Sequence, residues 1–180
     1  MVSSTLFSSL ILNRKTMKSK IHKHRNKYLL VSKDKVNEIQ ISYIEKVGTL
    51  KSLPVNNSDA VANLLFKNWD NKTIGLHETF KILLLNNSNK VKGIFPLSTG
   101  GITGTLVDIR ILFAIVLKTL SVGIILAHNH PSGKLLPSEA DKRLTQKIKK
   151  ASELLDIRLL DHIILTPNKE YYSFADNGLL

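Results

Sequence analysis

Cysteine is absent from this sequence of 180 residues. That absence excludes disulfide-stapled folds and every zinc site that depends on thiolate ligands, such as zinc fingers, zinc ribbons and the zinc deaminases with their cysteine pair. Long apolar runs are absent too, since none approaches the roughly 20 residues that a membrane-spanning helix requires. The chain is 43% apolar and long enough to form one domain whose core needs no metal or disulfide support.

Acidic residues are scarce at the N-terminal end of the chain. Residues 1–35 contain nine Lys or Arg but only one acid, Asp34, whereas residues 36–180 contain seventeen bases and thirteen acids. We therefore predict a basic, disordered tail over residues 1–35. Such a tail can contact nucleic-acid phosphates, but most basic tails are simply solvated, and both interpretations stay open. The bases concerned are Lys18, Lys20, Lys23, Arg25 and Lys27; His22 and His24, without an acidic third ligand nearby, are interpreted as tail residues.

The first twelve residues are rich in serine and apolar side chains, and the basic run follows them. A secretory signal has the opposite order, with its positive charges before the apolar segment. We therefore expect a cytoplasmic protein, with Met1 and Met17 both candidates for its first residue.

From Asn37 onward the hydrophobic pattern is that of an α/β domain. Alternating or fully apolar runs predict strands over residues 38–44, 77–86, 91–98, 122–128 and 157–165. Helices are predicted over residues 60–69, 107–120 and 138–155, with Ser58 capping the first and Leu144, Ile148 and Leu155 forming a stripe on the last. A turn over 86–90 makes a hairpin, and glycines predict a loop over 98–105. We predict an N-terminal strand and linker over 36–56, followed by one domain with a mixed sheet flanked by helices.

The most informative segment begins at the end of a predicted strand, where His128 and His130 are two residues apart. Side chains at this spacing on a strand point the same way, so two imidazoles can converge on one metal. Asp141 follows a loop punctuated by proline and glycine and lies in the first turn of a predicted helix. Two imidazoles and one carboxylate, with a fourth position open for water, form the ligand set of a catalytic zinc site.

A second interpretation of the same segment needs no metal. Ser138 and Asp141 match the capping box, in which a serine and an acid three residues later close the start of a helix. The two interpretations are compatible, because a metal ligand benefits from a rigid helix start.

The full spacing, H-x-H-x7-S-x2-D, resembles the JAMM motif of JAB/MPN-domain metalloproteases. The segment HNHPSG, followed by PS and an aspartate, is similar to the corresponding segment in the RadC branch of that family. Further similarity is found in an acid two residues before Phe80, in LLDHIIL and in the closing segment YYSFADNGLL. The resemblance covers roughly residues 57–180 and implies a single JAB/MPN-like domain there.

The resemblance also implies a mechanism. One zinc per chain is held by His128, His130 and Asp141, and Glu78 is the general base. Ser138 donates a hydrogen bond to the developing oxyanion or to the zinc water. The implied reaction is zinc-dependent hydrolysis of an amide or isopeptide bond in a peptide or protein conjugate. A charged residue such as Glu78 at the start of a buried strand is costly unless it faces a cleft, although an exposed strand-start glutamate is the alternative.

Other residues carry weaker signals. Asp161 and His162 could form an acid–imidazole pair, but adjacent residues of a strand face opposite sides. His162 is therefore interpreted as structural, with a position lining the cleft as the alternative. The loop residues Thr99, Gly100 and Gly101 form either a backbone wall near the metal or a turn without function. The basic helix is interpreted as a solvated face, and its bases are Lys142, Arg143, Lys147, Lys149 and Lys150.

The alternative function is a DNA-repair or nucleic-acid-associated adaptor, with a JAB fold that a metal stabilises but that does not hydrolyse. Its support is the basic tail, the basic helix and the association of RadC-like proteins with DNA repair. Longer RadC-like proteins carry an N-terminal helical region resembling a helix-hairpin-helix module. This sequence resembles a short form, because no G-x-G hairpin motif precedes the domain.

Overall fold

The computed structural model describes residues 54–101 and 104–180 of the chain. Within these ranges, five strands form one sheet in the order β2-β1-β3-β4-β5. The strands are β1 (Thr79–Leu85), β2 (Val91–Thr99), β3 (Gly123–Asn129), β4 (Arg158–Leu165) and β5 (Tyr171–Ser173). The tail predicted over residues 1–35 and the strand predicted over residues 38–44 lie outside the described residues.

The sheet is mixed. β1 pairs antiparallel with β2 in the predicted hairpin and antiparallel with β3 on its other side. β3 and β4 are parallel, and β5 is antiparallel to β4. A parallel pair needs a crossover connection, which helix α4 (Glu139–Glu153) provides. The loop that leaves the end of β3 therefore leads directly into the start of α4.

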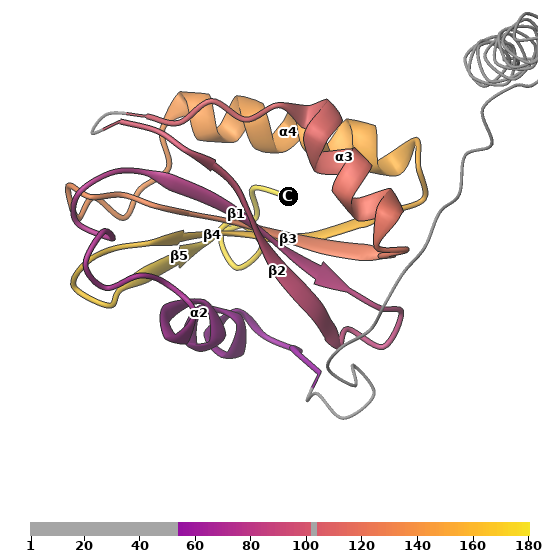
Figure 1. Cartoon of the computed structure of the whole chain (residues 1–180), viewed down its shortest axis with the longest axis horizontal. Coiled ribbons are helices and arrows are strands. Elements are labelled where there is room, and N and C mark those ends of the chain that lie inside the picture. Colours follow the sequence, from indigo (N-terminus) through magenta and orange to yellow (C-terminus); the bar gives the residue numbers. More distant parts are fainter. Residues whose placement is uncertain (1–53, 102–103) are drawn as a thin grey trace, which may run out of the picture. The chain divides into compact units, whose positions relative to one another are not determined.

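Helices cover both faces of this sheet, as Figure 1 shows. Helix α2 (Ser58–Lys67) packs on one face, in a core that includes Leu65, Leu83 and Ile125. Helices α3 (Ile109–Lys118) and α4 cover the other face. The predicted α/β domain with a mixed sheet flanked by helices is thus confirmed. Among the described residues, no helix is long and apolar enough to cross a membrane.

The start of α2 differs from the prediction by one residue. The helix begins at Ser58 and is capped by Asn57, whose side chain accepts a hydrogen bond from the Ala60 amide at 2.7 Å. The Ser58 hydroxyl instead donates to the carboxylate of Asp176. The predicted cap at Ser58 is therefore wrong: both residues are good caps, and a contact distant in sequence takes the serine.

The end of α4 also differs. The helix ends at Glu153, so Leu155 lies beyond it and is 41% exposed. The buried positions of α4 are Thr145, Ile148 and Ser152, so Leu155 was wrongly placed on the buried stripe. Two of these three side chains are polar, which is why a pattern based on apolar residues missed the face.

Candidate metal centre

Two histidines converge at the end of β3. His128 lies within the strand and His130 follows its last residue, so both rings project to the same side of the extended backbone. Their residues are only 2% and 8% exposed, and their Nε2 atoms lie 2.9 Å apart. The Phe80 ring of the neighbouring strand stacks on His128 with its centroid 6.0 Å away. The structure thus brings together the two rings that the sequence singled out.

The third predicted ligand, Asp141, lies in the first turn of α4. The predicted capping box is present, because the Ser138 hydroxyl oxygen accepts a hydrogen bond from the Asp141 amide at 3.1 Å. The Ser138 amide and hydroxyl both donate to Oδ2 of Asp141, at 2.7 and 2.6 Å. The other oxygen, Oδ1, lies 3.4 Å from Nε2 of His128. The cap therefore holds Oδ2, which also lies 3.6 Å from Nε2 of His130, and leaves Oδ1 without a bond to Ser138 and beside His128.

The cluster fits a metal ion such as zinc. One ligand atom each from His128, His130 and Asp141 lies within 4.8 Å of the others. Nδ1 of His130 lies 2.6 Å from the Lys134 carbonyl oxygen, which can only accept, so Nδ1 carries a proton and Nε2 is the atom that faces the cluster. Tetrahedral zinc, with Zn–N bonds of about 2.0–2.1 Å, holds its ligand atoms roughly 3.3 Å apart. The Nε2 atoms lie 2.9 Å apart and Oδ1 of Asp141 lies 3.4 Å from Nε2 of His128, so the three residues could hold a metal ion.

Burial and charge set the protonation states of the cluster. Burial lowers the pKa of His128 to about 4, so this ring is neutral at neutral pH. Burial alone would raise the pKa of Asp141, but hydrogen bonds from His130 and Ser138 and the proximity of His128 hold that pKa well below its usual value. A neutral imidazole and an ionised carboxylate are the forms that bind a metal.

The surroundings of His130 favour positive charge. Burial lowers its pKa, but the Asp141 carboxylate and the Lys134 carbonyl outweigh burial and raise the pKa above its usual value. The same negative potential that favours a proton on this ring also favours a metal cation.

Glu78 lies beside the cluster, just before β1. Phe80 pairs with His128 across β1 and β3, and Glu78 lies two residues before Phe80. Burial raises the pKa of Glu78, His130 opposes this change, and Asp141 adds to it. The charges of His130 and Asp141 therefore both act on the Glu78 carboxyl group, as the predicted role of general base requires.

The glycine-rich loop positions Glu78. Gly100 donates its amide to the Glu78 carbonyl at 2.8 Å, and the Glu78 amide donates to the Gly101 carbonyl at 3.0 Å. Thr99 does not belong to this loop, because it ends β2 and pairs with Thr79. Of the three residues predicted to form one backbone wall, Thr99 is thus the end of a strand. Gly100 and Gly101 form hydrogen bonds to the backbone of Glu78.

Asn129, between the two histidines, is a positioning residue that the sequence interpretation missed. Its side chain is fully buried and faces away from theirs. Oδ1 accepts the Thr79 amide at 2.8 Å, and Nδ2 donates to the carbonyls of Ile74 and His77 at 2.6 and 2.9 Å. Asn129 therefore ties the segment that carries Glu78 to the strand that carries the histidines. The available signal was a polar residue at an inward position of a buried strand.

His162 was interpreted as structural, and the structure places it directly behind His128. It is fully buried in β4, with Nε2 2.8 Å from Nδ1 of His128 and Nδ1 2.6 Å from Oγ1 of Thr145. Its neighbour Asp161 bonds Ser173 and the Ala175 amide, and so lies on the other face of the strand, as predicted. His162 thus contacts a predicted ligand without reaching the surface.

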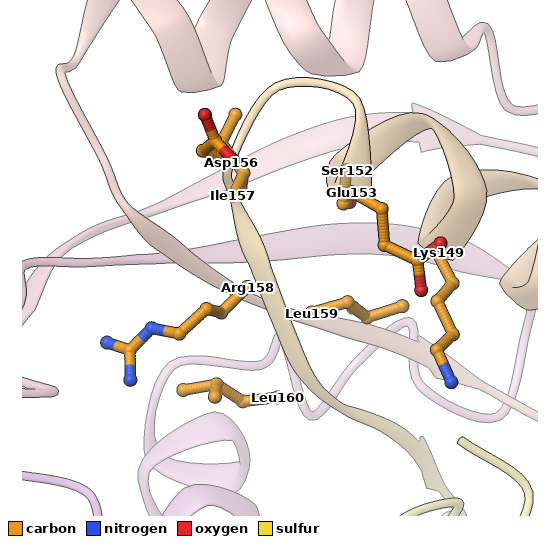
Figure 2. A pocket seen from close by; sticks show the side chains of 8 residues that line it. All are labelled: Lys149, Ser152, Glu153, Asp156, Ile157, Arg158, Leu159 and Leu160. Atoms are coloured by element: carbon orange, nitrogen blue, oxygen red, sulfur yellow. The ribbon is translucent and has the colours of Figure 1, made fainter.

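A separate cavity of about 560 Å³ lies at the other end of α4. Figure 2 shows Lys149 and Glu153 of the helix beside Leu159 of β4. Because a helix rises about 1.5 Å per residue, Ser152 in its lining lies roughly 17 Å along α4 from Asp141. None of the predicted site residues lines this cavity, so it is distinct from the histidine cluster.

Comparison with known proteins identifies one family. The model of the RadC-like JAB domain matches residues 55–179. A UPF0758 protein of Flavobacterium johnsoniae is 56% identical over 103 residues, which cover 57% of this chain and 44% of that protein. A UPF0758 protein of Porphyromonas gingivalis is 48% identical over 103 residues, which cover 57% of this chain and 45% of that protein.

The UPF0758 protein YkfG of Escherichia coli K12 is 44% identical over 103 residues, which cover 57% of this chain and 65% of that protein. This chain therefore spans less than two thirds of the length of these curated relatives, and their shared name states no reaction. The family match covers more than half of this chain and includes the whole histidine–aspartate cluster together with Glu78. The chain belongs to the RadC-like JAB domain family.

Proposed function

We propose that this chain is a zinc-dependent hydrolase that cleaves an amide or isopeptide bond in a peptide or protein conjugate. The observation that carries the proposal is the convergence of two imidazole nitrogens and one carboxylate oxygen at distances suited to zinc. Three protein ligands with a fourth position left for water is the arrangement of catalytic rather than structural zinc. The similarity to JAB/MPN metalloproteases supports the same reaction class.

The residues of the cluster have separate tasks in this proposal. Zinc held by His128, His130 and Asp141 would lower the pKa of a water from about 15.7 to about 7 and polarise the scissile carbonyl. Glu78 removes a proton from the attacking water and delivers it to the leaving amine nitrogen. Burial suits Glu78 to this task, because a raised pKa makes the carboxyl better able to hold a proton between the two transfers.

Ser138 is proposed to donate a hydrogen bond to the developing oxyanion or to the attacking water. In the structure its hydroxyl donates to Oδ2 of Asp141 at 2.6 Å, so this task requires the hydroxyl to turn during the reaction. The Ser138 amide, 2.7 Å from the same oxygen, continues to hold the carboxylate when the hydroxyl turns.

Metal content of the purified, untagged full chain tests the proposal. We expect about one zinc per chain by mass spectrometry, because the three ligand atoms form a single cluster. His128→Ala should lose the metal, whereas His77→Ala, at a histidine outside the cluster, should retain it. A wild-type chain that binds no zinc after zinc is added back would contradict the proposal.

Hydrolysis is tested on the same preparations. Glu78→Gln keeps the shape of the side chain but cannot accept a proton, so we expect it to retain zinc. Its kcat/KM should fall by at least about 100-fold toward whichever member of a panel of fluorogenic lysine isopeptides and peptide amides the wild type cleaves. Unchanged turnover would remove Glu78 from the role of base.

The second candidate function is a nucleic-acid-associated adaptor in which the metal stabilises the fold without hydrolysis. Its specific support is on α4, where Lys142, Arg143, Lys147 and Lys150 line a shallow depression together with Gln146. Such bases contact phosphates and give affinity that falls with salt, but they do not read sequence.

A further inference from the structure

We propose that His162 and Thr145 are positioning residues that set the tautomer of His128 and thereby present its Nε2 lone pair to the metal. The inference rests on the proposed function for the identity of the metal. The hydrogen bonds that carry it belong to the protein alone.

The three side chains form one line from α4 to the cluster. Oγ1 of Thr145 lies 2.7 Å from the carbonyl oxygen of Asp141 and 2.6 Å from Nδ1 of His162. Nε2 of His162 lies 2.8 Å from Nδ1 of His128. The line begins at the backbone of one ligand, Asp141, and ends on the ring of another.

The position of each proton follows from the first contact. A carbonyl oxygen only accepts, so the single hydroxyl proton of Thr145 lies on its bond to Asp141. The hydroxyl oxygen therefore accepts from Nδ1–H of His162. A neutral His162 then has a lone pair on Nε2, and this nitrogen accepts from Nδ1–H of His128. Nε2 of His128 is left without a proton and faces the cluster.

The second histidine, His130, also carries a proton on Nδ1, but its hydrogen-bond partner is a backbone carbonyl. The Lys134 carbonyl fixes the proton of His130 on Nδ1. Nε2 of His130 lies 2.9 Å from the unprotonated Nε2 of His128, so the two atoms face the same point. The proton order of the line therefore leaves the lone pair on Nε2 of His128 available to a metal.

Packing holds the line in place. His128, His162 and Thr145 have at most 2% of their surface exposed. The Phe174 ring stacks on His162 with centroids 4.6 Å apart, and the Phe80 ring contacts its edge at 5.5 Å. Water cannot easily replace a missing hydrogen-bond partner in such surroundings. The tautomer of His128 therefore depends on His162 and Thr145.

A matched pair of substitutions at Thr145 tests the proposal in the full chain. Thr145→Val keeps the shape and removes the hydroxyl, whereas Thr145→Ser keeps the hydroxyl. We expect Thr145→Val to weaken zinc binding by about 10–100-fold, measured by competition with a chromophoric chelator, because the ring must lose a proton from Nε2 before it binds. Thr145→Ser should stay within about threefold of the wild type. Equal zinc affinity in the two variants would overturn the proposal.

The tautomer itself is read from nitrogen chemical shifts of the histidine rings in zinc-free protein. We expect the proton of His128 on Nδ1 in the wild type and in Thr145→Ser, and on Nε2 in Thr145→Val. A His128 that keeps Nδ1–H in Thr145→Val would overturn the proposal. This result does not depend on zinc, so a wild type that bound no zinc would contradict the proposed function and leave the proton line decided by the spectra.

Two substitutions at His162 provide a second test if Thr145→Val does not fold. His162→Gln offers an amide oxygen to Nδ1–H of His128, whereas His162→Phe keeps a buried ring without an acceptor. We expect zinc affinity close to wild type in His162→Gln and a loss of about 10–100-fold in His162→Phe. The reverse order would overturn the proposal, because a residue needed only for packing is better replaced by phenylalanine.

Discussion

Two neighbouring glycines beside Glu78 have opposite tolerance for a side chain. A Cβ atom at Gly100 would lie 2.1 Å from the carbonyl oxygen of Gly104, whereas one at Gly101 would meet nothing within 4 Å. We expect Gly100→Ala to lower the free energy of unfolding by about 1–3 kcal/mol, because backbone must move to admit the methyl group. Gly101→Ala should stay within about 0.5 kcal/mol of the wild type in the same urea titration. Equal urea midpoints of unfolding for the two variants would contradict the close approach of Gly100 to the Gly104 carbonyl.

Single residues differ in how far the sequence predicts them. The convergence of His128, His130 and Asp141 was predictable because strand geometry and the capping box both act over a few residues. His162 and Thr145 were not, since their contacts cross from β4 to β3 and α4. An adjacent acid and histidine contain no information about the strand that will lie beside them.

The start of α4 combines a structural and a chemical task, and the two can be separated. Ser138→Ala removes the cap from the Asp141 amide and one of two bonds to its carboxylate. We expect a loss of about 1 kcal/mol in the free energy of unfolding and weaker zinc binding. Asn57→Ala, which uncaps α2 away from the cluster, should lose a similar free energy and keep its zinc affinity. Equal zinc affinities in chelator competition would reduce Ser138 to a cap.

Secondary structure elements were predicted well where hydrophobic periodicity is strong. The strands β1, β2, β3 and β4 and the helices α2, α3 and α4 lie within the predicted ranges or differ by one or two residues at their ends. The three-residue strand β5 was not predicted, because its pairing with Ile163, Ile164 and Leu165 rather than its own pattern makes it a strand. The order of the strands in the sheet was not predicted either, because hydrophobic periodicity is local in sequence and does not indicate which strands pair.

The charge of the whole molecule is +12 and is concentrated in two groups of bases. Replacing the five tail bases Lys18, Lys20, Lys23, Arg25 and Lys27 by glutamine tests the tail, and replacing the five bases of α4 tests the helix. If the tail is the nucleic-acid contact, only the first set should lower affinity for duplex DNA and reduce the slope of log affinity against log salt, by up to about 4.5. Unchanged slopes in both sets would dismiss the adaptor function, and zinc content serves as the control for folding.

The ligand set contains nitrogen and oxygen but no sulfur. Peroxide releases zinc from many protein sites by converting thiolate ligands to sulfenic and higher acids, a reaction that imidazole and carboxylate ligands do not undergo. A metal bound at the proposed site would therefore have no thiolate ligand to lose to peroxide, in contrast to thiolate-bound zinc. Control of such a site would come from metal supply or from access to the bound ion rather than from the redox state of the cell.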